Sequence, residues 1–107
     1  MAYVTLRRIN INEWPDAKLF IEADAKPIFV SMDGGDTTLP EIDVHFLVAG
    51  PASNDVERDF FVIRDGKPIT IDEGYAMVHV GSIVHDEYGA LHVFEIVRKE
   101  AARANAI

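Results

Sequence analysis

The stretch that most constrains how this chain can fold is residues 74–97, which read GYAMVHVGSIVHDEYGALHVFEIV. Its two arms are rich in Val, Ile, Phe and Met, residue types that favour β-strands. Between the arms, residues 86–89 (DEYG) have the composition of a turn. We therefore predict a β-hairpin here and expect the other strands to be arranged around it.

The rest of the chain is divided by turn signals into short segments of strand composition, without a helical period before residue 97. With 107 residues, 49% of them hydrophobic, the chain suits a single domain with one core. Residues 1–97 are therefore predicted to form an all-β domain, a small antiparallel β-sandwich or barrel of about seven strands. Residues 98–107 form a charged, Ala-rich tail, predicted to be a short helix or disordered.

The first strand contains a change of phase. Val4 and Leu6 alternate on one phase, and Ile9 and Ile11 on the other. Two interpretations fit this pattern: a β-bulge near Arg7 turns the following side chains to the other face, or the strand ends at Arg7 and a loop begins.

Three further features are predicted to be structural. Trp14 should cover one end of the core, as large aromatic side chains often do. Residues 33–38 (DGGDTT) should form a turn rather than a calcium site, because they lack the ligand spacing of an EF-hand loop. His45 should lie at the surface or rim, because it alternates with the apolar residues of 43–49.

The charge and composition exclude several kinds of partner. Eighteen acidic and ten basic residues give a net charge of −8, which repels phosphate backbones, so direct binding to nucleic acid is not expected. The chain has no Cys, which rules out disulfides and thiolate zinc sites. It also lacks a long apolar run and a signal-peptide pattern. We expect a soluble cytoplasmic protein with no membrane partner.

The histidines are candidate metal ligands or acid–base groups, and they occur at His45, His79, His85 and His92. With a four-residue hairpin loop (86–89), His92 would face Ile83 and His79 would face Ile96. With a three-residue loop ending at a left-handed Gly89, His79 and His92 would lie on opposite faces. Neither register brings the two histidines together, so no metal site is predicted.

Glu95 is the one chemically awkward residue of the hairpin, because it lies within the apolar run VFEIV. A buried carboxylate needs a partner, since uncompensated burial of a charge is costly. Arg58, Arg64 and His79 are the candidate partners. We predict that Glu95 forms a structural pair rather than acting as a general acid.

Nucleophilic catalysis has little support in the sequence. Ser31, Ser53 and Ser82 all lie outside a Gly-x-Ser-x-Gly motif, and Gly34-Gly35 is not followed by the Lys of a phosphate-binding loop. We therefore predict no catalytic, cofactor-binding or metal-binding residues, and the location of a binding site stays open.

Four short segments carry a resemblance to a known family: residues 60–63 (FFVI), 66–69 (GKPI), 80–83 (VGSI) and 89–95 (GALHVFE). In order and spacing they resemble a family of small phage and prophage proteins of unknown function. The likeness is good from residue 60 to 96 and looser before it. The resemblance implies a viral or prophage origin and a compact β fold, and it carries no activity.

The expected function is that of a non-enzymatic phage or prophage accessory protein. It would act in the bacterial host as a binding module on a host or phage protein, in host takeover or anti-defence. One alternative is a virion structural or assembly protein, such as a decoration or connector subunit, and another is a sponge for a small molecule. A homo-oligomer is also expected, because the hairpin arms are apolar on both faces and need a cover on each side.

Overall fold

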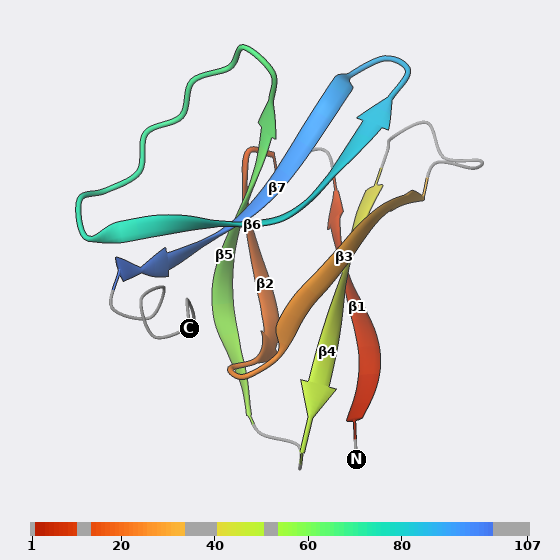
Figure 1. Ribbon diagram of the computed structural model, residues 1–107, viewed down its shortest axis with the longest axis vertical. Coiled ribbons are helices and arrows are strands. Elements are labelled where there is room, and N and C mark those ends of the chain that lie inside the picture. The colour runs from red at the N-terminus through yellow and green to blue at the C-terminus, as the bar shows by residue number, and fades with distance from the viewer. Residues whose placement is uncertain (1, 11–13, 34–40, 51–53, 100–107) are drawn as a thin grey trace.

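The computed structural model describes residues 2–10, 14–33, 41–50 and 54–99, and these form seven antiparallel strands in two sheets (Figure 1). The strands are β1 (Ala2–Asn10), β2 (Asp16–Glu22), β3 (Lys26–Asp33), β4 (Glu41–Ala49), β5 (Asp55–Arg64), β6 (Tyr75–His85) and β7 (Gly89–Arg98). One sheet has the order β1-β4-β3 and the other β2-β5-β7-β6. The predicted all-β fold with about seven strands is thus confirmed.

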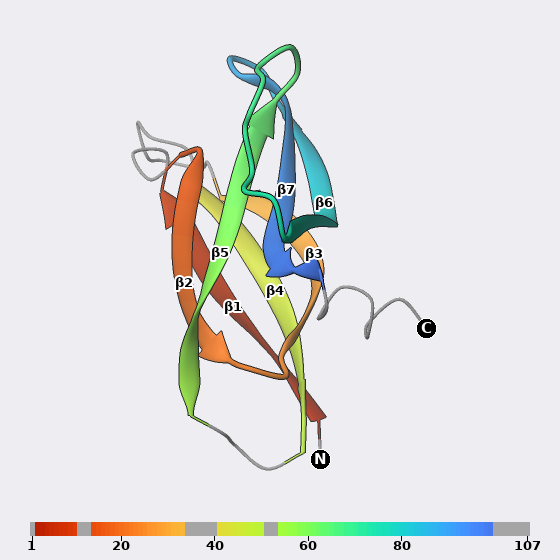
Figure 2. The same ribbon diagram turned by 90° about the vertical axis from the view of Figure 1, so that its left-hand side faces the viewer.

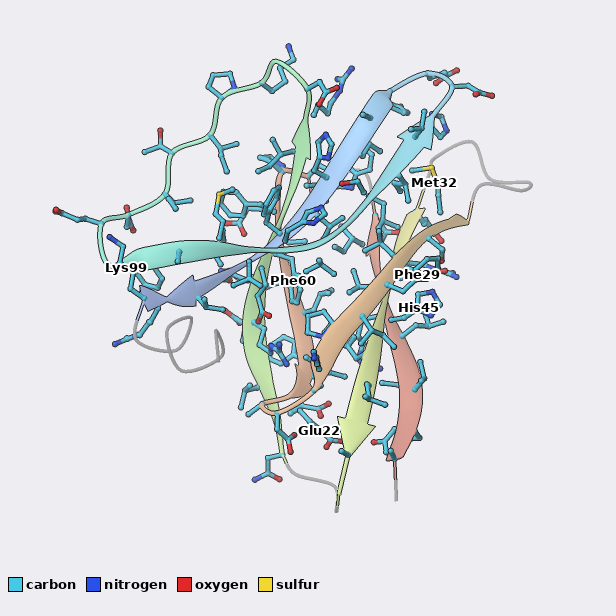
Figure 3. All side chains as sticks on the ribbon, viewed as in Figure 1. Glu22, Phe29, Met32, His45, Phe60 and Lys99 are labelled. Carbon is cyan, nitrogen blue, oxygen red and sulfur yellow. The ribbon has the colours of Figure 1, made fainter. Side chains whose placement is uncertain are left out.

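The core lies between the two sheets. Strand β4 contributes four side chains with no exposed surface, at alternate positions: Ile42, Val44, Phe46 and Val48. The rings of Phe46 and Phe60 meet edge to face across the two sheets, with centroids 5.8 Å apart. Phe60 lies near the centre of the molecule in Figure 3, and Figure 2 shows β5 in front of β1 and β4. The period-two pattern of the sequence therefore places one face of each sheet in the core.

Both interpretations of the change of phase in the first strand are wrong. It pairs with β4 without interruption from Ala2 to Asn10, so it has no bulge and does not end at Arg7. Ile9 faces the core and is fully buried, whereas Val4 and Leu6 lie on the outer face and are exposed. The phase changes because apolar residues occupy both faces of one regular strand.

The edges of the two sheets lie against each other on both sides of the sandwich. At one edge the Tyr3 hydroxyl donates to Glu22 Oε1 over 2.8 Å, and Arg7 Nε donates to the Phe20 carbonyl over 2.9 Å, so side chains join β1 to β2. The hydrogen bond to Glu22 also raises the pKa of the Tyr3 hydroxyl. At the other edge β3 lies against β6. The sandwich therefore resembles a flattened barrel.

The predicted hairpin is present, but both expected registers are wrong. The loop comprises residues 86–88, Gly89 has a positive φ of 75°, and His85 pairs with Gly89. As a result His92 pairs with Ser82 rather than with Ile83. The register then shifts between His79 and Gly81, which leaves one extra residue in β6. A bulge of this kind changes which side chains share a face.

Only some of the other structural predictions concern residues that the structure describes. Trp14 is half-buried against the core and meets the Tyr88 ring edge to face, with centroids 5.7 Å apart, so its predicted role as a cover is confirmed. Residues 34–38 of the predicted turn at 33–38, Ser53, and residues 100–107 of the predicted tail at 98–107 lie outside the described residues, whereas Arg98 belongs to β7 rather than to a tail. Among the described residues, no helix is long and apolar enough to cross a membrane.

Candidate functional site

The outer face of the three-stranded sheet carries a group of exposed apolar side chains, here called the apolar face: Val4, Leu6, Phe29 and Leu47. Val4 pairs directly with Leu47, and His45 lies between its partners Leu6 on β1 and Phe29 on β3. The exposed fractions are 57% for Val4, 44% for Leu6, 58% for Phe29 and 37% for Leu47. Adjacent exposed side chains of this size are typical of an interaction surface.

The alternation of side chains along β4 explains why its residues on this face are external. Val44, Phe46 and Val48 fill the core, so the side chains between them must point to the opposite side of the sheet. His45 and Leu47 are therefore external, as predicted for His45. Because the side chains behind the face are fully buried, the surface rests on a well-packed sheet rather than on a loop.

His45 is held in place at the centre of the apolar face. Its Nε2 lies 3.0 Å from Ser31 Oγ, and its ring centroid lies 5.4 Å from that of Phe29. Figure 3 shows Phe29 and His45 beside each other on β3 and β4. These contacts leave Phe29 more than half exposed, and it is the largest of the exposed apolar side chains on this surface.

Charged groups at one end of the apolar face are paired with each other. Arg8 Nε lies 2.9 Å from Asp43 Oδ1, and Arg8 Nη1 lies 3.1 Å from Glu41 Oε2. Lys26, which pairs with Leu47 across the strands, is exposed at the other end. The centre of the face therefore carries no carboxylate, lysine or arginine side chain, although the chain has a net charge of −8.

Glu95 is buried in the core and forms the predicted structural pair with Arg58. Arg58 Nε donates to Glu95 Oε2 over 2.7 Å and Nη2 donates to Oε1 over 2.8 Å, which is a bidentate pair. Arg58 Nη1 also donates to the carbonyl oxygens of Glu22 and Ala25. The other candidate partners lie elsewhere: His79 is on the exposed face of β6, and Arg64 lies over the Tyr88 ring.

The outer face of the four-stranded sheet carries a chain of hydrogen bonds that the sequence did not reveal, here called the polar chain: His79, Ser82, His92 and Asp65. Ser82 Oγ lies 2.9 Å from His79 Nε2 and 2.7 Å from His92 Nδ1. His92 Nε2 lies 2.8 Å from Asp65 Oδ1. The prediction that His79 and His92 stay apart is wrong, because the bulge in β6 places His79 on the same face as Ser82, which pairs with His92 on β7.

The hydrogen-bond partners of each side chain determine which atoms carry the protons in the polar chain. An ionised carboxylate only accepts, so His92 Nε2 donates to Asp65 and its Nδ1 accepts the Ser82 hydroxyl proton. His79 Nε2 then donates to Ser82 Oγ. The Ser82 hydroxyl is thus engaged by both imidazoles on an exposed surface. Among the described residues, no group of three or more His, Cys, Asp or Glu could hold a metal ion.

Replacing Ser82 by alanine should release His92 Nδ1 with little effect on the fold. The loss in unfolding free energy should stay below about 1 kcal/mol, because these hydrogen bonds are exposed and water can replace them. The ¹⁵N chemical shifts of the His92 ring should move, while those of His45 should not. Asp65→Asn should reduce the population of the Nε2–H tautomer of His92. Unchanged His92 shifts in both variants would contradict the assigned polar chain.

The fourth histidine has a local role. His85 Nδ1 accepts the backbone N–H groups of Glu87 and Tyr88, over 3.0 and 3.4 Å, and so stabilises the hairpin loop. Its side chain makes no ion pair with the neighbouring carboxylates among the described contacts.

Two signals in the sequence could have revealed these surfaces. Gly81 within a strand pattern is typical of a bulge, which would have placed His79 and Ser82 on one face. Val4 and Leu6, out of phase with Ile9, indicate the apolar face. Comparison with known proteins adds no relative from which a role could be transferred: no protein-family model, no curated protein and no solved structure matches this chain.

Proposed function

We propose that the protein is a non-enzymatic binding module that docks onto a partner protein through the apolar face. The observation that carries this proposal is the exposure of Val4, Leu6, Phe29 and Leu47 side by side on a rigid sheet. An apolar centre with an aromatic anchor resembles the core of a protein–protein interface. The paired charges of Arg8, Asp43 and Glu41 would form part of its polar rim.

A protein partner suits this surface better than a phosphate polymer or a lipid membrane. The net charge of −8 opposes approach to nucleic acids and to anionic membrane surfaces. The centre of the apolar face lacks the basic residues that either would need, since it consists of Val4, Leu6, Phe29, Leu47 and the imidazole of His45.

The resemblance of residues 60–96 to phage and prophage proteins supports a biological setting for this activity. On that basis the partner would be a host or phage protein in the cytoplasm of a bacterial host, and binding would serve host takeover or anti-defence.

The docking surface can be tested with a matched pair of phenylalanines. Phe20 and Phe29 are both 58% exposed, but Phe20 lies on β2 of the other sheet. Phe29→Ser should weaken capture of a partner from bacterial lysate by at least about tenfold, because a central aromatic anchor is lost. Phe20→Ser should bind like the unmodified protein. Quantitative mass spectrometry of the captured proteins, followed by binding with the purified partner, measures the difference.

Two outcomes would change the proposal. If every protein captured by the unmodified chain is retained by Phe29→Ser, the apolar face is not the docking surface. If the purified chain is a closed trimer or hexamer that Phe29→Ser dissociates, the face joins copies of this chain. That result would favour the virion structural or assembly role.

A further inference from the structure

A cavity of about 220 Å³ lies on the outer face of the four-stranded sheet, on the opposite side of the molecule from the apolar face. Phe61 of β5 and Ile96 of β7 form its apolar floor. Residues 70–72 and Tyr75 form another wall. Figures 1 and 2 show the connection between β5 and β6, in green, returning along this side of the sheet. The volume suits a small ligand, since pockets for drug-sized molecules start at about 300 Å³.

Three carboxylates line the cavity, and among the described residues only that of Asp59 forms an ion pair. Lys18 Nζ lies 2.6 Å from Asp59 Oδ1 and 3.7 Å from Glu57 Oε1. The carboxylates of Asp16 and Asp72 form no hydrogen bond or ion pair with the other described residues. The register explains the position of Asp16, which pairs with Phe61 and so lies beside the apolar floor, whereas Asp72 comes from the connection between β5 and β6.

The electrostatic environment of Lys18 agrees with this excess of negative charge. The hydrogen bond and the charge of Asp59 raise the pKa of Lys18, and the charges of Asp16 and Glu57 raise it further. A cation at this place is therefore stabilised by several carboxylates at once. One lysine does not neutralise them all.

We propose that this cavity binds a small organic ammonium ion. The aliphatic body of the ligand would lie on Phe61 and Ile96, and its ammonium group would face Asp16 and Asp72. The apolar floor favours an alkylammonium ion over a strongly hydrated inorganic cation, because burial of the alkyl chain adds a hydrophobic contribution. The carboxylates in turn disfavour anionic ligands of the same size.

The test is an amide ¹H–¹⁵N NMR titration with butylammonium chloride, alongside butanol and sodium chloride at the same ionic strength. Butylammonium should shift amides near residues 16, 59–61, 70–75 and 96, with a Kd at least about tenfold below that of butanol. The double variant Asp16→Asn/Asp72→Asn should raise this Kd by about tenfold. Glu73→Gln is the matched control, because Glu73 is adjacent to Asp72 but does not line the cavity, and its Kd should stay close to that of the unmodified protein.

Several results would overturn the proposal: no shifts with butylammonium, equal Kd values for butylammonium and butanol, or the same shifts with sodium chloride. An unchanged Kd in the double variant would also overturn it. Amides outside the cavity report whether each variant keeps its fold. This proposal is independent of the docking surface, because Phe29→Ser changes the other sheet and should leave butylammonium binding unaltered.

Discussion

Replacing Arg58 by alanine is expected to lower the free energy of unfolding by about 3–5 kcal/mol, because one partner of a buried ion pair is then left without compensation. The Glu95 side chain is only 9% exposed and would lose both of its hydrogen bonds to the guanidinium. The Ala25 carbonyl oxygen would lose the Arg58 donor as well, and the Glu22 carbonyl oxygen would keep the bond from the Ala25 backbone N–H. Denaturation with urea measures the loss, provided that the slope of the transition is unchanged.

Two controls separate this effect from the general cost of a charge deletion. Lys18→Ala removes the ion pair with Asp59, in which both side chains are exposed to solvent, so it should cost much less than Arg58→Ala. The double variant Arg58→Met/Glu95→Leu replaces both charges by apolar groups and should be more stable than Arg58→Ala alone. If Arg58→Ala costs no more than Lys18→Ala, the pair does not have this structural role.

Gly81→Ala is expected to cost about 1–3 kcal/mol, the range for overpacking a well-packed core. A Cβ atom at position 81 would lie 2.6 Å from Val30 Cγ2, at the edge where β3 and β6 meet. Val30 is 3% exposed and β-branched, so it has little freedom to move away. Urea denaturation of Gly81→Ala against the unmodified protein measures the cost.

The contact between Val30 and position 81 can be isolated with a double-mutant cycle. Val30→Ala removes the methyl group that the new Cβ would meet, so Gly81→Ala should cost less in the Val30→Ala background than in the unmodified protein. Equal costs in the two backgrounds would show that the penalty arises from the strand itself rather than from the contact across the edge.

The features that local pattern determines were predictable from the sequence. Residues 74–97 form a hairpin because strand-favouring residues flank a turn with glycine at its end. The alternation in β4 gave the correct face for His45. The need of Glu95 for a partner followed from the apolar residues around it, since a buried carboxylate is stable only when compensated.

The features that depend on distant contacts were not predictable. Arg58 was one of three candidate partners, and only the pairing of β5 with β7 selects it. The polar chain depends on the bulge in β6, where Gly81 allows close approach of Val30 from the other sheet. The cavity depends on the path of the connection between β5 and β6. A one-residue shift of register reverses the faces, so local composition cannot settle such contacts.

Arg58 lies beside the turn at which the chain passes from one sheet to the other. The chain crosses from the four-stranded to the three-stranded sheet between β2 and β3, and Arg58 binds the backbone on both sides of this crossing. The bond to the Ala25 carbonyl holds the chain directly before β3 against the four-stranded sheet, and so opposes sliding of one sheet over the other. The protein should therefore act as a rigid spacer: a partner docked on one surface leaves the opposite surface open, and both can be occupied in the same molecule.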